Sequence, residues 1–253
     1  MADAEPDRIY TAALLVIGDE ILSGRTQDAN TAYLGKWLGV QGIRLREVRV
    51  VADDHAAIGA AVNALRTIYD YLFTTGGIGP THDDITVDAI AAALGVEVVV
   101  HPQAEAILTS YYGDKLTDAR LRMARVPAGA ELIENPRTGA PGIRHGNIFI
   151  MAGVPSITQG MLAALDGTLP GGKPVLSRTV AAWTAESIVA SVLGSVEKAN
   201  PGTQIGSYPF WREGRTGANF VIRATDPALL DACATALLTA LTEAGISPVD
   251  GEL

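Results

Sequence analysis

The sequence has 253 residues, of which 48% are hydrophobic and 19% are charged, and its net charge at pH 7 is -9. This length suits one large domain followed by a small one, and the acidic balance argues against binding of duplex nucleic acid. The single cysteine, Cys233, excludes an intrachain disulfide and a multi-cysteine zinc site.

The sequence has no features of a membrane or secreted protein. No stretch approaches the roughly 18 consecutive apolar residues that a membrane span needs. The first seven residues are acidic and polar, unlike a secretory signal. We therefore expect a cytoplasmic protein with no membrane partner.

Strand-like and helix-like segments alternate over the first 100 residues. Apolar runs predict strands, and apolar residues at helical spacing predict helices. The predicted strands are 10–17, 43–51, 69–75 and 97–100, and the predicted helices are 29–40, 56–68 and 87–94, the last of them capped by Thr86. This order predicts a three-layer α/β/α fold with a mostly parallel sheet.

Beyond residue 100 the pattern changes. Helices are expected at 103–112, 117–124 and 155–165, with a turn-rich loop at 135–142 and a hairpin at 143–151. The stretch 169–174 has the composition of a linker. A small βαββα domain is expected after it, with strands at 176–182, 203–208 and 219–224 and helices at 185–199 and 228–244. The predicted domains are 1–170 and 175–253.

The third predicted strand ends in a glycine-rich loop, Thr74-Thr75-Gly76-Gly77-Ile78-Gly79-Pro80-Thr81. Its three glycines lack the Cβ atoms that would keep a phosphate away from the backbone. The hydroxyls of Thr75 and Thr81 add hydrogen-bond donors, and the following helix points its N-terminus back at the loop. Neither common phosphate-loop motif is present. The residues alone therefore predict a phosphate or nucleotide site at Thr75, Gly76, Gly77, Gly79 and Thr81.

Two successive carboxylates, Asp83 and Asp84, follow this loop. They would repel a phosphate unless a cation lay between them, so they predict a bound Mg²⁺-like metal. The alternative is that one of the two only caps the next helix.

Further polar residues follow the other predicted strands. Asp19 follows the first strand, with Asn30 soon after it, and Asp53 follows the second. Ligands of parallel sheets bind at the carboxyl ends of the strands, which makes these residues candidates; helix capping by Asp28, Asn30, Asp53 or Asp54 is the alternative. The loop at 135–142 adds Asn135, Pro141 and Gly142 as candidates, with Arg137 or Arg144 available to a phosphate.

These motifs resemble the molybdopterin-binding domain of MoaB and Mog proteins. Within that superfamily they are closer to the N-terminal region of CinA proteins and to the FAD-hydrolase part of eukaryotic FAD synthases. The resemblance rests on the glycine loop with Asp83-Asp84-Ile85-Thr86, on Gly18-Asp19-Glu20-Ile21-Leu22-Ser23-Gly24, on Asp28 with Asn30, on Asn135-Pro136 with Ala140-Pro141-Gly142, and on Gly153-Val154-Pro155-Ser156. It continues beyond the linker in Thr184-Ala185-Glu186-Ser187, Asn200-Pro201 and Ile205-Gly206-Ser207-Tyr208-Pro209.

The resemblance implies a site. The family's acidic functional positions fall on Asp53 and Asp84, and the glycine loop would hold the phosphate of the ligand. CinA proteins usually have Glu after Gly-Val-Pro-Ser, whereas this sequence has Ile157, which favours the FAD-hydrolase branch.

Two functional hypotheses follow. The first is a metal-dependent nucleotide pyrophosphatase that cleaves FAD or ADP-ribose with Mg²⁺, Mn²⁺ or Co²⁺, in which Asp83 and Asp84 hold the metal with help from Asp53 or Asp19. The alternative is a protein that binds molybdopterin without hydrolysing it. The four basic residues Lys198, Arg212, Arg215 and Arg223 are too few to predict nucleic-acid binding by the small domain. The resemblance also implies a homo-oligomer.

Overall fold

The computed structural model describes residues 8–253, and the chain divides into two units, Met1–Gly172 and Lys173–Leu253. The acidic segment 1–7, on which the expectation of a cytoplasmic location partly rests, lies outside the described residues. Among the described residues, no helix is both long enough and apolar enough to cross a membrane.

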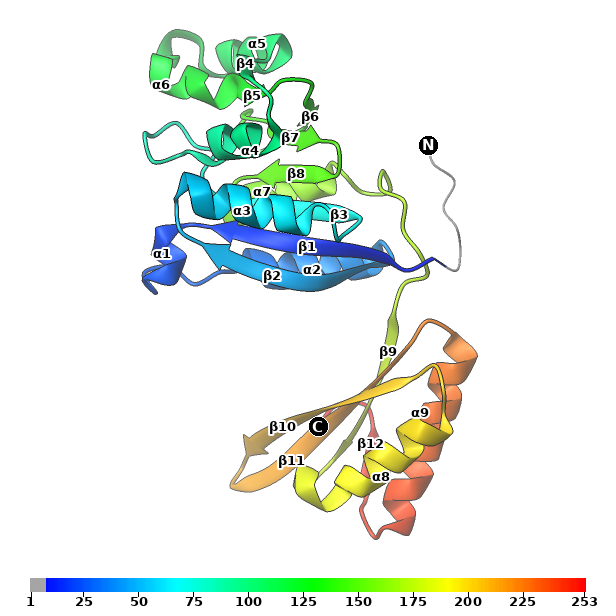
Figure 1. Ribbon diagram of the computed structural model, residues 1–253. Coiled ribbons are helices and arrows are strands. Elements are labelled where there is room, and N and C mark those ends of the chain that lie inside the picture. Colours follow the sequence, from blue (N-terminus) through cyan, green and yellow to red (C-terminus); the bar gives the residue numbers. More distant parts are fainter. Residues whose placement is uncertain (1–7) are drawn as a thin grey trace. The chain divides into compact units, whose positions relative to one another are not determined.

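The first unit is built on a six-stranded sheet with the order β2-β1-β3-β8-β7-β6 (Figure 1). Strands β2, β1, β3 and β8 are parallel to their neighbours in this order, and only β7 and β6 add antiparallel pairs. The sheet is mostly parallel, as predicted. The strands are β1 (Tyr10–Ile17), β2 (Ile43–Val51), β3 (Tyr71–Thr75), β6 (Glu131–Ile133), β7 (Gly142–His145) and β8 (Ile148–Met151).

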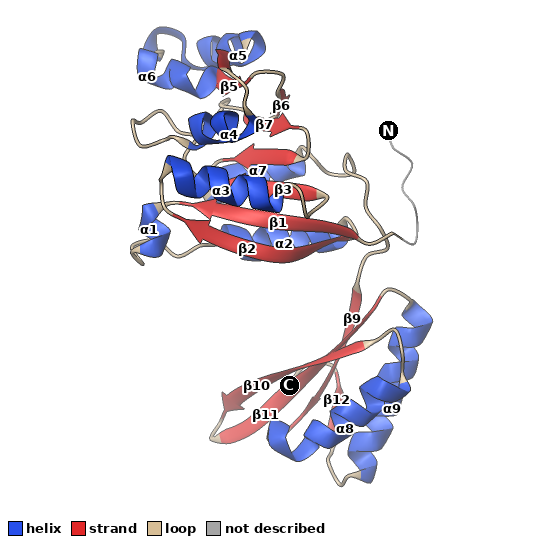
Figure 2. Cartoon of the chain, in the orientation of Figure 1, coloured by secondary structure: helices blue, strands red, loops and turns tan. Residues whose placement is uncertain are grey.

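Helices cover both faces of this sheet, which gives the predicted three layers (Figure 2). Helices α2 (Asn30–Val40) and α7 (Pro155–Ala163) pack on one face, against the β1 side chains Leu14 and Val16. Helices α3 (His55–Leu65) and α4 (Thr86–Leu94) pack on the other face, against Leu15 and Ile17 of the same strand. Alternate residues of β1 thus belong to two separate cores, which explains its unbroken apolar sequence.

The region between α4 and β6 forms a small lobe beside the sheet. It contains α5 (Pro102–Tyr112), α6 (Asp118–Leu121), the short 3₁₀ turns η1 (Gly113–Lys115) and η2 (Arg122–Ala124), and a two-stranded sheet of β4 (Val98–Val100) and β5 (Arg125–Pro127). The strand expected at 97–100 is therefore present but pairs outside the main sheet. The helix expected at 117–124 is divided into α6 and η2.

The second unit has the order β9 (Leu176–Ala182), α8 (Glu186–Ala199), β10 (Gln204–Arg212), β11 (Arg215–Ala224), α9 (Pro227–Glu243) and β12 (Pro248–Asp250). Its four strands form an antiparallel sheet with the order β10-β11-β9-β12. Helices α8 and α9 pack on one face, where Cys233 is fully buried among apolar side chains. The predicted βαββα order is correct, and β12 adds a strand that the prediction lacked.

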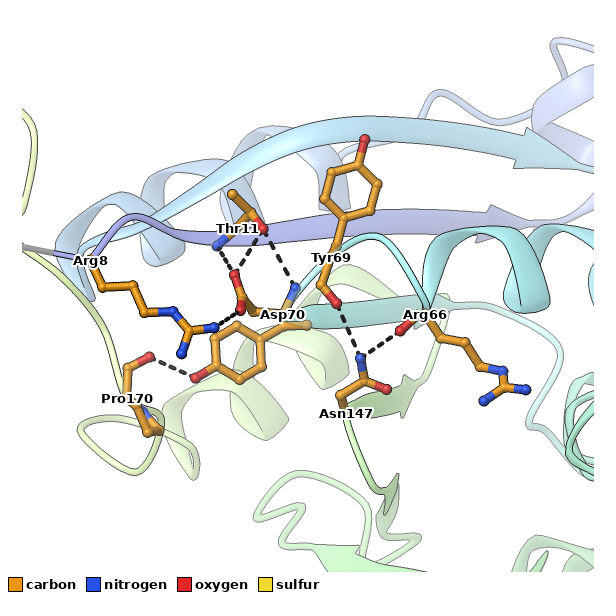
Figure 3. Close-up of polar contacts among 8 residues, drawn as sticks. Arg8, Thr11, Arg66, Tyr69, Asp70, Asn147 and Pro170 are labelled. Carbon is orange, nitrogen blue, oxygen red and sulfur yellow. Dashed lines mark hydrogen bonds and ion pairs between the residues drawn. The ribbon is translucent and has the colours of Figure 1, made fainter. Parts of the chain in front are cut away.

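A polar network fixes the amino ends of the strands in the first unit, at the edge away from the glycine loop (Figure 3). The carboxylate of Asp70, just before β3, accepts hydrogen bonds from the backbone and the hydroxyl of Thr11 and forms an ion pair with Arg8. Next to it, the Asn147 amide donates to the carbonyl oxygens of Arg66 and Tyr69. These contacts tie β1, β3 and the β7–β8 turn together.

Asp70 is expected to make the stability of the first unit depend on pH. Burial opposes its ionisation, but the Thr11 hydrogen bonds and the Arg8 charge outweigh this effect and hold the pKa of Asp70 below its usual range. A lowered carboxyl pKa stabilises the fold above the unfolded-state pKa, near 4, and the stabilisation is lost as the pH falls through the folded-state pKa. We expect Asp70→Asn to lower the free energy of unfolding by about 1–2 kcal/mol at pH 7.

Denaturant titrations of the wild type and of Asp70→Asn at pH 7 and at about pH 2 test this prediction. The difference in the free energy of unfolding between the two proteins should be large at pH 7. It should be close to zero at low pH, where Asp70 of the wild type is protonated in both the folded and the unfolded state. Asp114→Asn is the control, because Asp114 is exposed. An equal difference at both pH values would contradict the proposed role of the charge.

Candidate functional site

A cleft of about 690 Å³ lies at the carboxyl edge of the sheet in the first unit. This volume is within the range of roughly 300–1,000 Å³ that is typical of small-molecule sites. Its floor is the glycine loop with Asp84, and the loop after β8 forms one wall. The other lining residues come from three segments: Glu20 and Thr26, the turn from Asn135 to Pro141, and Tyr112, Arg120 and Met123 of the small lobe.

The glycine loop adopts a conformation that only glycine tolerates at two positions. Gly76 has a φ of 106° and Gly77 a φ of 66°. A Cβ on Gly76 would lie 2.1 Å from the carbonyl oxygen of Ile17, and one on Gly77 would lie 2.2 Å from the Thr86 hydroxyl. The loop is therefore pressed against β1 and against the start of α4, as close-packed phosphate loops require.

Asp84 holds the loop in shape. Its carboxylate accepts hydrogen bonds from the backbone N–H of Gly79, at 2.7 Å, from that of Thr81, at 2.8 Å, and from the Thr81 hydroxyl. The capping alternative considered for Asp83 and Asp84 does not hold, because residue Ile85 is the N-cap of α4 and no side chain caps the helix. The same observation makes the prediction of a Thr86 cap wrong: Thr86 is the first helical residue, and its buried hydroxyl donates to the carbonyl oxygen of Gly76.

Several donors of this loop are left for a ligand. The backbone N–H groups of Gly77 and Ile78, which line the cleft, have no acceptor within residues 8–253. The hydroxyls of Thr74 and Thr75 are buried at the end of β3 and likewise have no partner in the described part of the chain. Thr75 lies behind the loop and does not line the cleft. Gly77 and Ile78 are partly exposed to the cleft, and backbone amides in such loops bind phosphate oxygens, so these two amides point to an anionic ligand.

The acidic residues of the first two loops lie next to each other. The carboxylate of Asp53 accepts a hydrogen bond of 2.9 Å from the backbone N–H of Asp19. Burial raises the pKa of Asp53, and the negative charges of Asp19, Glu20 and Asp83 raise it further, against the effect of the Asp19 amide. Several carboxylates thus crowd the edge of the sheet beside the glycine loop.

Only one of the two adjacent aspartates in the second loop caps the helix that follows. Asp54, and not Asp53, is the N-cap of α3, and its side chain accepts from the backbone N–H of Ala57. In the first loop, Asp28 accepts from the backbone N–H of Asn30. The buried Asn30 amide donates to the carbonyl oxygen of Gly153, at 2.8 Å. Asp28 and Asn30 therefore fix the walls of the cleft, and neither lines it.

The turn at 135–142 lines the cleft with Asn135 and Pro141. The Asn135 amide donates to the Thr138 hydroxyl and to the Ala140 carbonyl, both at 2.7 Å, so this side chain shapes the turn. Gly142 belongs to β7 and does not reach the cleft; a Cβ there would lie 3.1 Å from the sulfur of Met161. Its role is to allow close packing.

Sequence reasoning gave no site role to several residues of the cleft, namely Tyr112, Arg120 and Met123, and Ala152, Gly153, Val154, Pro155 and Ile157 of the loop after β8. The loop after β8 could have been predicted to line the cleft, because β8 is parallel to β3 and its loop therefore lies at the same edge of the sheet. A Cβ on Gly153 would lie 3.3 Å from Cα of Gly76, so the two glycines let the loops meet. Tyr112 and Arg120 had no such signal, because they come from the lobe outside the main sheet.

A metal at this site would need the ligand as a partner. Within residues 8–253, no three His, Cys, Asp or Glu side chains are arranged to hold a metal ion by themselves. Mg²⁺ commonly takes one or two carboxylates together with water and substrate phosphates. Carboxylates that lie beside the unpaired Gly77 and Ile78 amides fit a cation that is shared with a bound phosphate.

Comparison with known proteins agrees with this arrangement. The family model described as "Probable molybdopterin binding domain" matches residues 13–170, and the one described as "FAD synthase, middle domain" matches residues 174–250. A protein of Thermoplasma acidophilum is 33% identical over 205 residues, which cover 78% of this chain and 80% of that protein. A CinA-like protein of Desulfosudis oleivorans is 33% identical over 210 residues, 77% of this chain and 51% of that protein.

A solved structure supports the same relationship. The crystal structure of a CinA protein from T. acidophilum is 35% identical and has a TM-score of 0.60, covering 63% of this chain and 98% of that one. Both the mostly parallel sheet and the sequence motifs are thus accounted for by one family. The chain belongs to the molybdopterin-binding domain family, is CinA-like, and carries a second domain of the kind found in the middle of FAD synthase.

Proposed function

We propose that the first unit is a divalent-metal-dependent nucleotide pyrophosphatase that cleaves FAD or ADP-ribose. The observation that carries this proposal is the pair of unpaired backbone N–H groups, Gly77 and Ile78, on the floor of a cleft of about 690 Å³. Such amides bind phosphate oxygens. The match of residues 174–250 to the middle domain of FAD synthase favours a flavin dinucleotide among the substrates.

Each part of the site has a role in this proposal. The two amides bind one phosphate, and Asp84 keeps the loop in the shape that presents them. Asp83 and Asp84, with Asp53 or Asp19, would hold Mg²⁺, Mn²⁺ or Co²⁺, although three of the roughly four acceptor positions of Asp84 are already used within the loop. Such an ion neutralises phosphate charge and activates water.

The second candidate function is binding of molybdopterin without hydrolysis. It is favoured by the description of the family model that matches residues 13–170. The cleft and the free amides fit a pterin phosphate as well as a nucleotide phosphate. The two candidate functions are therefore distinguished by whether the protein cleaves its ligand.

We expect the purified protein to release AMP from FAD or from ADP-ribose in the presence of Mg²⁺, Mn²⁺ or Co²⁺. Asp84→Ala leaves the Gly79 and Thr81 donors without their acceptor, so it should lower the rate by roughly 100-fold or more. Chromatography of the products measures both rates, and Asp114→Asn serves as the control with an unchanged site. Absence of cleavage with all three metals, together with tight molybdopterin binding, would support the second candidate instead.

A further inference from the structure

Arg120 brings a positive charge to an otherwise acidic cleft. Among the described residues that line the cleft, it is the only basic one, whereas Glu20 and Asp84 are acidic. The side chain is half-buried. Across residues 8–253 no carboxylate lies within ion-pair distance of it. A partly buried guanidinium without a counterion is unfavourable unless a ligand supplies the negative charge.

The guanidinium of Arg120 is held in place before any ligand arrives. It lies over the ring of Tyr112, 4.5 Å from the ring centroid, and donates to the backbone carbonyl oxygen of Lys115. Tyr112 is in turn packed edge-on against Tyr111, with 4.9 Å between the ring centroids. The left-handed Gly139, where a Cβ would lie 2.8 Å from the Tyr111 ring, lets this pair pack on the 135–142 turn. The lobe and the turn thus form one rigid support for Arg120.

The segment that carries Arg120 lies beside the glycine loop. Met123, three residues further on, lines the cleft and also lines a small cavity together with Gly77, Gly79 and Asp84. Arg120 and the two free amides therefore line the same cleft. Guanidinium groups bind phosphates through two parallel hydrogen bonds, a geometry that a preoriented arginine favours.

We propose that Arg120 binds a second phosphate of the ligand, next to the phosphate held by the Gly77 and Ile78 amides, and so selects diphosphate-containing nucleotides. This inference rests on the proposed function for its class of ligand but not on hydrolysis. It assigns a specificity role to a residue of the small lobe. The rival explanation is that Arg120 only stabilises the lobe through Tyr112 and Lys115.

The preference for ADP over AMP distinguishes these explanations. Dissociation constants are measured by calorimetry with Mg²⁺ present, because a cation offsets the repulsion between the carboxylates and the phosphates, and chromatography of the sample checks that both nucleotides stay intact. We expect the wild type to bind ADP about 10- to 100-fold more tightly than AMP, and Arg120→Ala to lose most of this preference. Arg120→Lys should restore it only in part, because an ammonium group offers no fork of donors. Lys115→Ala, which removes an exposed charge but leaves the carbonyl acceptor of Arg120, should keep the wild-type preference.

A purely structural role would weaken binding of AMP and ADP by the same factor and leave their ratio unchanged, which would overturn the proposal. So would a wild type that does not prefer ADP, or that binds neither nucleotide. The outcome is independent of the cleavage assay: a protein that shows the predicted ratio but cleaves neither FAD nor ADP-ribose would retain the Arg120 assignment and lose the pyrophosphatase proposal.

Discussion

Gly76→Ala is expected to destabilise the first unit by about 2–4 kcal/mol. The φ of 106° at this position is unfavourable for any residue with a Cβ. The added atom would also lie 2.1 Å from the Ile17 carbonyl oxygen. Ile17 ends β1, which pairs with β2 on one side and β3 on the other, and the Gly76 N–H donates to the carbonyl oxygen of Met151, so a shift of either residue would break hydrogen bonds of the sheet.

Gly146→Ala is the matched control for this experiment. Gly146 also has a positive φ, of 60°, but nothing lies within 4 Å of a Cβ placed there. It should therefore show only the conformational cost of about 1–2 kcal/mol. Denaturant titration of both variants gives the difference that is due to the clash. Equal losses of stability would mean that the loop can move away from β1, and the close packing inferred for the glycine loop would be wrong.

The sheet of the first unit was largely predictable because its signals are local. Strands β1 and β2 have the bounds that were predicted, β1 from its almost continuous apolar run and β2 from its partly alternating pattern; in the second unit β9 also has its predicted bounds. β5 and β6 have three residues each, too few for an alternating pattern to appear, and β12 is as short. The sequence predicted the strand at 97–100 but not the strand that it pairs with. Its pairing with β5 depends on the fold of the whole lobe between them.

The sequence predicted the part of the candidate site that lies at the carboxyl ends of the strands, but not the part that comes from the small lobe. Parallel strands bring the loops after β1, β2 and β3 together, so the neighbourhood of Asp19 and Asp53 followed from topology. Asp54, and not Asp53, caps α3 because of the backbone dihedral angles at this point. Two adjacent aspartates in a sequence do not show which of them has these angles. Arg120 contacts Tyr112 within its lobe, and nothing in its local sequence indicates that the lobe faces the glycine loop.

Replacing Asp53 with asparagine is expected to change activity and stability in different directions. The raised pKa of Asp53 means that the folded protein disfavours the charged form, first through burial and then through Asp19, Glu20 and Asp83. A raised carboxyl pKa contributes stability that is fully present below the unfolded-state pKa, near 4, and is lost as the pH rises through the folded-state pKa. At pH 7 the charge of Asp53 therefore opposes folding.

Asparagine keeps an oxygen that can accept from the Asp19 amide but cannot ionise. In metal-free buffer at pH 7, Asp53→Asn should unfold at the same temperature as the wild type or slightly above it, whereas at about pH 3 it should gain nothing. With metal present, the variant should cleave FAD or ADP-ribose roughly 100-fold more slowly, or worse, if Asp53 assists at the reacting centre. Thermal melts at the two pH values and the cleavage assay measure both effects.

The combination of the two results decides what Asp53 does. Asp54→Asn is the matched control, since Asp54 caps α3 with its side chain and should affect the helix and not the reaction. Unchanged cleavage by Asp53→Asn would remove Asp53 from the site, whatever the melts show. A variant that is both slow and clearly less stable at pH 7 would assign Asp53 to the fold, because the crowding of charge that raises its pKa should be relieved by the neutral side chain. Stability kept or gained while activity falls is the pattern expected of a carboxylate retained for a cationic partner.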